Sequence, residues 1–311
     1  MRIRRINIAG AFIGLMLLSL SCKKDRSGSK GALGSGNVYF TWADEGTLKI
    51  NLQSGAKSLV LPNDTKQNGF DVSKDQKRIL VQEDVPGQYD TQRFKILDLN
   101  NGTVISSMDF TSTETYTNPR LSPNGTLILC SPLLPGSVTI LNIVTQKFTT
   151  IKDIQGKSLT NACWMPDETI LLSTANALYR SNKTFDQVSL IKNMDFSSWG
   201  SVAVRNDGKK IAFAGDKHIW MMDANADNLM QITDSNSEEG AVCFSPDGSF
   251  MIVGTYNFAS GGGPWAKYYT MFIVPADGKK YQMDSSDSNV KPVIAHGESS
   301  PQSYDSKVQW L

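Results

Sequence analysis

The stretch Val242-Cys243-Phe244-Ser245-Pro246-Asp247-Gly248-Ser249-Phe250-Met251-Ile252-Val253 decides the fold. It consists of an apolar strand, a tight turn and a second, strongly apolar strand. In the turn, proline presets the first corner, the aspartate hydrogen-bonds its own backbone, and the glycine supplies a positive φ. The acidic residue is therefore expected to form a turn rather than to perform chemistry.

The same unit recurs along the chain, followed each time by a hairpin and two further strands. The Asp or Asn residues at the centres of five such turns lie 49, 43, 40 and 40 residues apart. This is the period of four-stranded propeller blades, which take roughly 40 to 50 residues each. The five turn residues are Asp75, Asn124, Asp167, Asp207 and Asp247.

The two ends of the chain supply a sixth blade. Asn37–Trp42, Gly46–Leu52 and Lys57–Leu61 have the pattern of second, third and fourth strands that lack a first. Lys307–Leu311 has the pattern of a first strand alone. Pairing the two ends closes the ring and removes its exposed edges. We therefore predict an all-β, six-bladed β-propeller; the alternative is seven blades, with the additional blade in residues 284–306.

The N-terminus has the pattern of a targeting segment. Met1–Arg5 is basic, and Ile8–Leu20 is apolar but short for a bilayer span. Leu18-Ser19-Leu20-Ser21-Cys22 resembles the lipobox of bacterial lipoproteins, although Ser19 stands where that family usually has leucine. The resemblance implies that the Cys22 thiol carries a diacylglycerol; a plain secreted protein is the alternative.

Three segments follow from these patterns. Residues 1–21 are expected to be a lipoprotein signal peptide, and residues 22–36, which are polar and rich in Gly and Ser, a flexible tether. Residues 37–311 are expected to form the propeller domain.

The composition argues against nucleic acid as a partner. Removing the first 21 residues takes three arginines from the 31 basic side chains, so 28 remain against 30 acidic ones. A nearly neutral mature chain without a Lys/Arg run offers no electrostatic footprint for a polyanion.

Blades five and six carry a family resemblance. Phe244-Ser245-Pro246-Asp247-Gly248 and Ile211-Ala212-Phe213, the latter followed by IWMMDANADNLMQIT at residues 219–233, resemble the repeat of the TolB-type propellers. The resemblance covers nearly all of residues 37–311. It implies a propeller of the cell envelope that binds partner proteins or inserted peptides.

One hairpin is unusually long. Between the second and third strands of blade six, Thr255–Lys267 intervenes where other blades have a short turn. In a propeller this hairpin and the loop leading into each first strand lie on the same rim of the channel. Rigid aromatic rings on exposed loops commonly anchor peptides and sugar rings. The candidate ligand-binding rim consists of Tyr89, Tyr116, Trp199, Tyr256, Phe258 and Trp265; alternatively, these rings only cap the propeller core.

Motifs for metals, cofactors and catalysis are weak. Asp223-x-Asn225-x-Asp227 imitates part of a calcium loop, but it lacks the glycine at the sixth position and the glutamate at the twelfth. We interpret it as a hairpin turn, and we expect no metal and no cofactor. The three cysteines after Cys22 lie in apolar runs, and the two histidines, His218 and His296, lie in unrelated places. No catalytic residue can be named.

The sequence therefore predicts a functional class and not a particular ligand. We expect a non-catalytic lipoprotein of the bacterial cell envelope, periplasmic or surface-facing, whose TolB-like propeller is a scaffold for an envelope protein or peptide. A glycan-binding lipoprotein would use the same rim. A lyase or hydrolase of propeller type would require a carboxylate cluster in the channel with perturbed ionisation. Both remain alternatives, because fold alone does not decide function.

Overall fold

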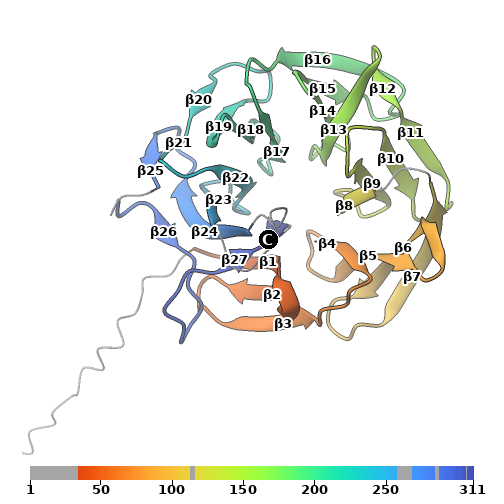
Figure 1. The fold of residues 1–311 in the computed structure, drawn as a ribbon, viewed down its shortest axis with the longest axis horizontal. Coiled ribbons are helices and arrows are strands. Elements are labelled where there is room, and N and C mark those ends of the chain that lie inside the picture. Colours follow the sequence, from red (N-terminus) through yellow and green to blue (C-terminus); the bar gives the residue numbers. More distant parts are fainter. Residues whose placement is uncertain (1–33, 113–115, 258–267, 284–286, 306) are drawn as a thin grey trace, which may run out of the picture. The chain divides into compact units, whose positions relative to one another are not determined.

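The computed structural model describes residues 34–112, 116–257, 268–283, 287–305 and 307–311. Their strands form six antiparallel sheets around a common centre, which makes a six-bladed β-propeller (Figure 1). The predicted all-β class and the six blades are therefore confirmed. The described residues contain a single short helical element, the 3-10 turn η1 (Ala43–Glu45), and no helix among them is long and apolar enough to cross a bilayer.

Within each blade the first strand lies nearest the centre and the fourth lies at the outer edge. Blade 1 takes its first strand from the C-terminal end of the chain. From the centre outwards, the strands of blades 1 to 3 are β28 (Val308–Trp310), β1 (Asn37–Trp42), β2 (Gly46–Asn51) and β3 (Lys57–Leu61); β4 (Gln67–Val72), β5 (Arg78–Val85), β6 (Gln88–Asp98) and β7 (Val104–Thr111); and β8 (Tyr116–Leu121), β9 (Leu127–Pro132), β10 (Val138–Asn142) and β11 (Phe148–Ile151).

Blades 4 to 6 follow the same plan, with small additions at their edges. The two-residue strand β12 (Asp153–Ile154) extends blade 4, and a parallel pair, β21 (Thr233–Asp234) with β25 (Tyr281–Gln282), joins blades 5 and 6. The remaining strands are β13 (Lys157–Trp164), β14 (Ile170–Thr174), β15 (Ala177–Ser181) and β16 (Val188–Asn193); β17 (Trp199–Val204), β18 (Lys210–Gly215), β19 (His218–Asp223) and β20 (Met230–Gln231); and β22 (Glu239–Phe244), β23 (Phe250–Asn257), β24 (Tyr268–Pro275), β26 (Lys291–Pro292) and β27 (Ser303–Tyr304).

The repeated turns form as their residues predict. Asp247 accepts a hydrogen bond from the backbone two residues on (3.0 Å) and another from the Ser245 hydroxyl (2.6 Å). Gly248 has a φ of 71°. Gln76 and Glu168 occupy the same place in blades 2 and 4 with φ of 53° and 69°, so these turns keep the left-handed conformation without glycine. The acidic residue of the repeat is thus a turn former.

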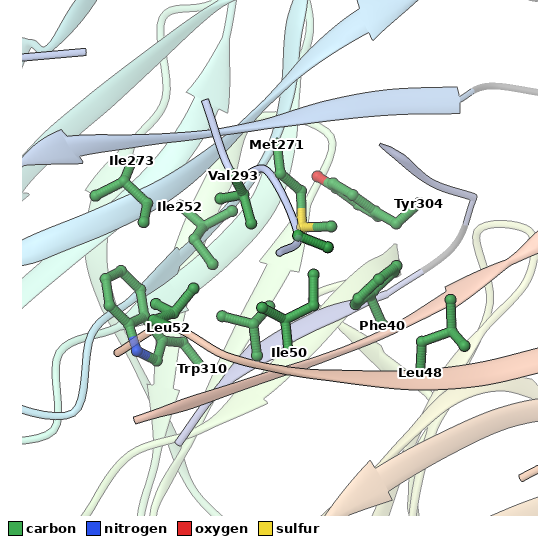
Figure 2. Close-up of a cluster of buried hydrophobic side chains, with 12 residues drawn as sticks. Phe40, Leu48, Ile50, Leu52, Ile252, Met271, Ile273, Val293, Tyr304 and Trp310 are labelled. Atoms are coloured by element: carbon green, nitrogen blue, oxygen red, sulfur yellow. The ribbon is translucent and has the colours of Figure 1, made fainter. Parts of the chain in front are cut away.

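The two ends of the chain close the ring, as predicted. β1 pairs with β28 so that Val38 lies opposite Trp310, and the backbones of Asn37 and Leu311 exchange two hydrogen bonds of 2.6 and 2.9 Å. An apolar cluster fills the space between blades 1 and 6 (Figure 2). Its buried members are Val38, Phe40, Leu48, Ile50, Leu52, Ile252, Met271, Ile273, Val293, Ala295, Tyr304 and Trp310.

The seven-bladed alternative is wrong. The described parts of residues 284–306 contain β26 and β27, and both pair with β24 at the outer side of blade 6. A long connection therefore completes an existing blade, because its polar, Ser-rich sequence has too few apolar residues for a four-stranded sheet of its own.

The signal peptide and most of the tether, including Cys22, lie outside the described residues. The last tether residues already contact the propeller: the Ser35 carbonyl accepts a hydrogen bond from the Trp310 indole (2.8 Å), and the Gly36 carbonyl accepts one from the Leu52 amide (3.0 Å).

Candidate functional site

The strand order gives the propeller two structurally distinct faces. In blade 5, Trp199 at the start of β17 pairs with Gly215 beside the β18–β19 hairpin, whereas Val204 at its other end pairs with Ile211 beside the Asp207 turn. The side of the ring that carries the β18–β19 hairpin and the matching hairpins of the other blades is called the hairpin face. The opposite side, which carries the Asp207 turn and the matching turns, is called the turn face. The predicted rim corresponds to the hairpin face.

The predicted rim residues differ in exposure. Tyr89, at the β5–β6 hairpin, is fully exposed. Trp199 and Tyr256, near the ends of β17 and β23, are partly exposed. Phe258 and Trp265 lie outside the described residues.

Tyr116 requires a correction, because its ring is inside the protein. It is 2% exposed. Its hydroxyl hydrogen-bonds with Ser137 (3.1 Å) and accepts from Thr139 (3.0 Å), and its ring lies 5.9 Å from that of Phe110. These contacts fix Tyr116 in the core between blades 2 and 3, so this residue offers no accessible aromatic surface.

A shallow groove of about 190 Å³ lies on the hairpin face between blades 5 and 6, lined by Trp199 and Tyr269. The indole nitrogen of Trp199 donates to the Ala175 carbonyl (2.9 Å), and its ring meets that of Phe213 edge-on at 6.0 Å. The Trp199 ring is therefore held in place. Three glycines also line the groove, Gly200, Gly215 and Gly240. Gly200 and Gly240 are partly exposed beside the rings, whereas Gly215 is buried.

Tyr269 is fixed by other aromatic rings. It stacks on Tyr304 with ring centroids 5.6 Å apart, and it meets Tyr256 at 6.3 Å. A Cβ atom on Gly240 would lie 2.4 Å from the Tyr269 ring. Glycine at this position therefore allows the ring to rest against the backbone of β22.

The aromatic cluster extends beyond the residues that the sequence singled out. Trp42 of β1 meets Tyr268 of β24 edge-on at 5.3 Å. Tyr268 and Tyr269 follow directly after the long hairpin, and this adjacency was the available sequence signal. Tyr304 gave no such signal, because it lies in a polar connection and reaches the cluster only through the pairing of β27 with β24.

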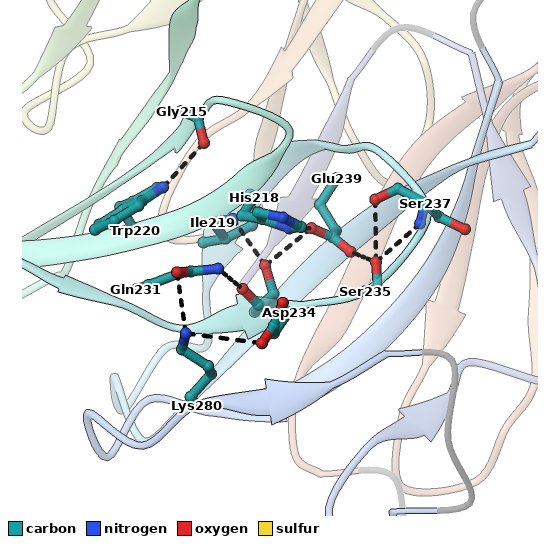
Figure 3. Close-up of polar contacts among 11 residues, drawn as sticks. Gly215, His218, Ile219, Trp220, Gln231, Asp234, Ser235, Ser237, Glu239 and Lys280 are labelled. Atoms are coloured by element: carbon teal, nitrogen blue, oxygen red, sulfur yellow. Dashed lines mark hydrogen bonds and ion pairs between the residues drawn. The ribbon is translucent and has the colours of Figure 1, made fainter. Parts of the chain in front are cut away.

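A buried carboxylate anchors the wall of the groove (Figure 3). The Glu239 side chain is 0% exposed. It accepts hydrogen bonds from the hydroxyls of Thr233 (3.0 Å) and Ser235 and lies 2.8 Å from Nδ1 of His218. The Glu239 amide also donates to the Lys217 carbonyl (2.7 Å). These bonds tie the loop before β22 to blade 5, so we assign His218 and Glu239 a structural role.

A second cavity, also of about 190 Å³, occupies the central channel where the first strands end at the turn face. Residues of all six blades line it. Asp71 of β4 bonds Lys307, which precedes β28, and also accepts from the Leu121 amide of β8 (2.8 Å). This contact joins blades 1, 2 and 3. The sequence signal was a charged side chain at a position that is usually apolar, and our sequence interpretation overlooked it.

The cysteines of the core are poor nucleophiles. Cys130 and Cys163 are buried, and burial raises the pKa of both thiols, in Cys163 to about 11. The thiolate is the reactive form, so neither sulfur is activated near neutral pH.

The calcium-like motif forms a hairpin turn. The Asp223 carboxylate is bonded by Lys210 (2.5 Å) and Asn228 (2.6 Å), and the Asp223 amide donates to the Asp227 carbonyl (2.9 Å). Lys210 and Asn228 hold the pKa of Asp223 below its usual value through these hydrogen bonds. Within the described ranges, no three His, Cys, Asp or Glu side chains are grouped so as to hold a metal ion.

Comparison with known proteins gives structural matches only. No family model and no curated protein matches the sequence. TolB from Acinetobacter baumannii matches with a TM-score of 0.59 and 18% identity, over 78% of this chain and 62% of that one. The protein named "putative TolB" from Agrobacterium tumefaciens gives 0.60 and 16%, over 84% and 90%. The Cps50 (Swd1) propeller domain from Myceliophteria thermophila gives 0.53 and 11%, over 78% and 84%.

These TM-scores show a shared fold, and at such low identities they show the fold alone. The predicted resemblance to TolB-type propellers is confirmed at that level. The chain spans 62% of the length of the Acinetobacter TolB.

Proposed function

We propose that the propeller is a non-catalytic scaffold of the cell envelope that binds a protein or peptide in the groove between Trp199 and Tyr269. The observation that carries the proposal is the pairing of two fixed aromatic rings with glycine backbone between them. Rings that are already immobilised lose little side-chain entropy on binding, and the absence of side chains on the glycines lets an extended chain approach closely. The resemblance to TolB-type propellers, which implies protein partners, supports the same function.

The groove has polar groups beside its rings. Asp216, Lys217 and Glu238 line it together with Ser198 and Ser201. An aromatic centre with charged groups at its edge is the usual anatomy of a protein interface. Glu239, the buried acid beside the groove, accepts hydrogen bonds from Thr233 and Ser235 and contacts His218, which is consistent with its structural role.

Site-specific cross-linking in intact cells tests this proposal. A photo-reactive amino acid at Ser198, which is exposed in the groove, should cross-link a discrete partner. The same amino acid at Lys147, which is exposed between β10 and β11, is the control and should not. Trp199→Ala should reduce the Ser198 cross-link at least tenfold, whereas Phe148→Ala, an exposed aromatic on the outer strand of blade 3, should leave it unchanged.

Two outcomes would redirect the proposal. Equal cross-linking from Ser198 and Lys147 would show that the groove is not the binding surface. Retention on a polysaccharide column that is lost in Trp199→Ala, without any protein cross-link, would favour the glycan-binding alternative, because sugar rings stack on aromatic side chains.

We also propose that the chain is held in the envelope by a lipid on Cys22. The lipobox-like sequence before this residue supports the anchor. Growth with an alkyne-labelled fatty acid should label the wild-type protein and should not label Cys22→Ser. Equal labelling of the two proteins, or none in either, would leave the secreted alternative.

A further inference from the structure

The channel cavity holds an excess of positive charge. Its charged lining residues are Asp71, Lys74, Arg120 and Lys307, three cations and one anion. Lys74 is exposed at the turn, whereas the other three lie deeper along the first strands. How these three are partnered determines what the cavity can accept.

Asp71 and Lys307 satisfy each other. The Lys307 ammonium bonds the Asp71 carboxylate and donates to the carbonyls of Phe70 (2.9 Å) and Pro119 (3.2 Å), which uses its three hydrogens. The other Asp71 oxygen accepts from the Leu121 amide (2.8 Å). The pair is therefore neutral as a unit and leaves little capacity for a further ligand.

Arg120 is in the opposite situation. Within the part of the chain that the structure describes, no carboxylate pairs with its guanidinium, and its buried Nε has no hydrogen-bond acceptor. A buried donor without an acceptor is costly, and a charged donor more so. Arginines and lysines elsewhere do have carboxylate partners on the surface. These partners are Glu83, Asp109 and Asp167.

The guanidinium lies within the ring of first strands. Its charge acts on Cys163 of blade 4 and on Lys307 of blade 1, although Arg120 itself belongs to blade 3. Burial, opposed by Asp71 and reinforced by Arg120, lowers the pKa of Lys307 to about 8. The channel thus already holds more positive charge than its own acid neutralises.

Most of the remaining lining residues are apolar, although polar atoms make up more than half of the surface that the cavity exposes. The apolar residues include Val72, Met165, Val242 and Phe244, contributed by three of the blades or the turns that follow their first strands. The cavity volume of about 190 Å³ is below the roughly 300–1,000 Å³ of pockets for drug-sized ligands. The walls and volume suit a group about the size of one amino-acid residue.

We propose that this cavity binds a carboxylate on a small apolar body, with the guanidinium of Arg120 as its counter-ion. Arginine presents a planar fork that matches a carboxylate in two parallel hydrogen bonds. The apolar side chains of the lining would contact the rest of the ligand. The site opens on the turn face and shares no lining residue with the groove of the proposed function, so it stands independently of that proposal.

The first test uses matched ligands on the unmodified protein. In titration calorimetry, N-acetyl-leucine should bind at least tenfold more tightly than N-acetyl-leucinamide, which has the same body without the charge. Equal binding of acid and amide, or binding of neither, overturns the proposal.

The second test removes the counter-ion. Arg120→Met keeps the length of the side chain and should lose the preference for the acid over the amide, whereas Arg120→Lys should keep part of it. The melting temperature of Arg120→Met without ligand should be no lower than that of the wild type, because no acceptor is lost. Unchanged acid binding by a folded Arg120→Met protein also overturns the proposal.

A third comparison identifies the source of the carboxylate. A pentapeptide that ends in leucine with a free carboxylate is titrated beside the same peptide with an amidated end. Tighter binding of the free peptide than of N-acetyl-leucine assigns a peptide C-terminus as the ligand. Tighter binding of N-acetyl-leucine assigns a small organic acid. Both results support the site, and equal binding of the free and amidated peptides counts against a peptide terminus.

Discussion

Glycine is required in the aromatic cluster by space rather than by backbone conformation. A Cβ atom on Gly254 would lie 2.1 Å from the Tyr304 hydroxyl oxygen and 2.9 Å from the Tyr269 Cβ. Tyr304 is 0% exposed and cannot swing away. We expect Gly254→Ala to lower the free energy of unfolding by about 1–3 kcal/mol, as overpacked core substitutions do. Urea denaturation measures this change.

Gly200→Ala is the matched control, because nothing lies within 4 Å of the added Cβ. Its free energy of unfolding should stay within about 0.5 kcal/mol of the wild type. A similar loss in both variants would show that the effect belongs to glycine in a strand and not to contact with Tyr304.

Lys307 gives the protein a pH dependence of known sign. Its folded pKa of about 8 lies below the ordinary value of 10.5. Between these pH values the unfolded chain holds more protons on this residue, so its contribution to stability rises with pH. The free energy of unfolding of the wild type relative to Lys307→Met should therefore increase from pH 8 to pH 10, by about 1–3 kcal/mol.

The comparison with Lys307→Met is needed because other groups have the opposite slope. Burial raises the pKa values of Cys130, Cys163 and Tyr304, so folded stability falls as the pH rises toward those values. These groups are present in both proteins and cancel in the difference. The free energy of unfolding of both proteins is measured by urea denaturation at several pH values. A difference between them that stays constant from pH 8 to pH 10 would rule out a lowered Lys307 pKa.

The three-residue strand β28 is expected to contribute more to stability than its length suggests, because it closes the ring. Three residues pair with β1, and Trp310 packs among the buried residues of blades 1 and 6. Trp310→Ala should lower the free energy of unfolding by about 3–5 kcal/mol. Deletion of 307–311 should lower the melting temperature further, by roughly 10 °C or more, because the ring also opens.

Val144→Ala is the control for Trp310→Ala, since this side chain is 79% exposed in the β10–β11 turn. It should leave the melting temperature unchanged. A deletion protein with the melting temperature of the wild type would contradict closure by β28.

The strands and turns could be predicted because each is specified locally. The Ser-Pro-Asp-Gly turn at residues 245–248 and the incomplete first blade, Asn37–Trp42 with Lys307–Leu311, both follow from spacing and apolar pattern. The structure confirms them almost to the residue.

The site was less predictable, because exposure and partnering depend on neighbouring blades. Tyr116 and Trp199 both begin first strands, yet only Trp199 remains accessible, since Ser137 and Thr139 enclose the other ring. The Asp71–Lys307 contact joins residues 236 positions apart, and no periodicity indicates it.

The propeller carries its two candidate sites on opposite faces. The first strands run from the hairpin face, where the Trp199 groove lies, to the turn face, where the channel cavity ends. The two proposed sites therefore lie far enough apart for each to bind its own ligand. Whether their binding is linked depends on the strands between them, which are paired along most of their length.

We expect the two proposed sites to act independently. Residues without shared partners usually contribute additively, within about 0.5 kcal/mol. Trp199→Ala should leave the affinity for N-acetyl-leucine within twofold of the wild type, and Arg120→Met should leave the Ser198 cross-link unchanged. The free energy of unfolding of the double variant should equal the sum of the single changes, measured in urea. A tenfold loss of acid binding in Trp199→Ala would instead indicate that β17 and its neighbours transmit a change across the ring, and the two faces would then have to be treated as one coupled site.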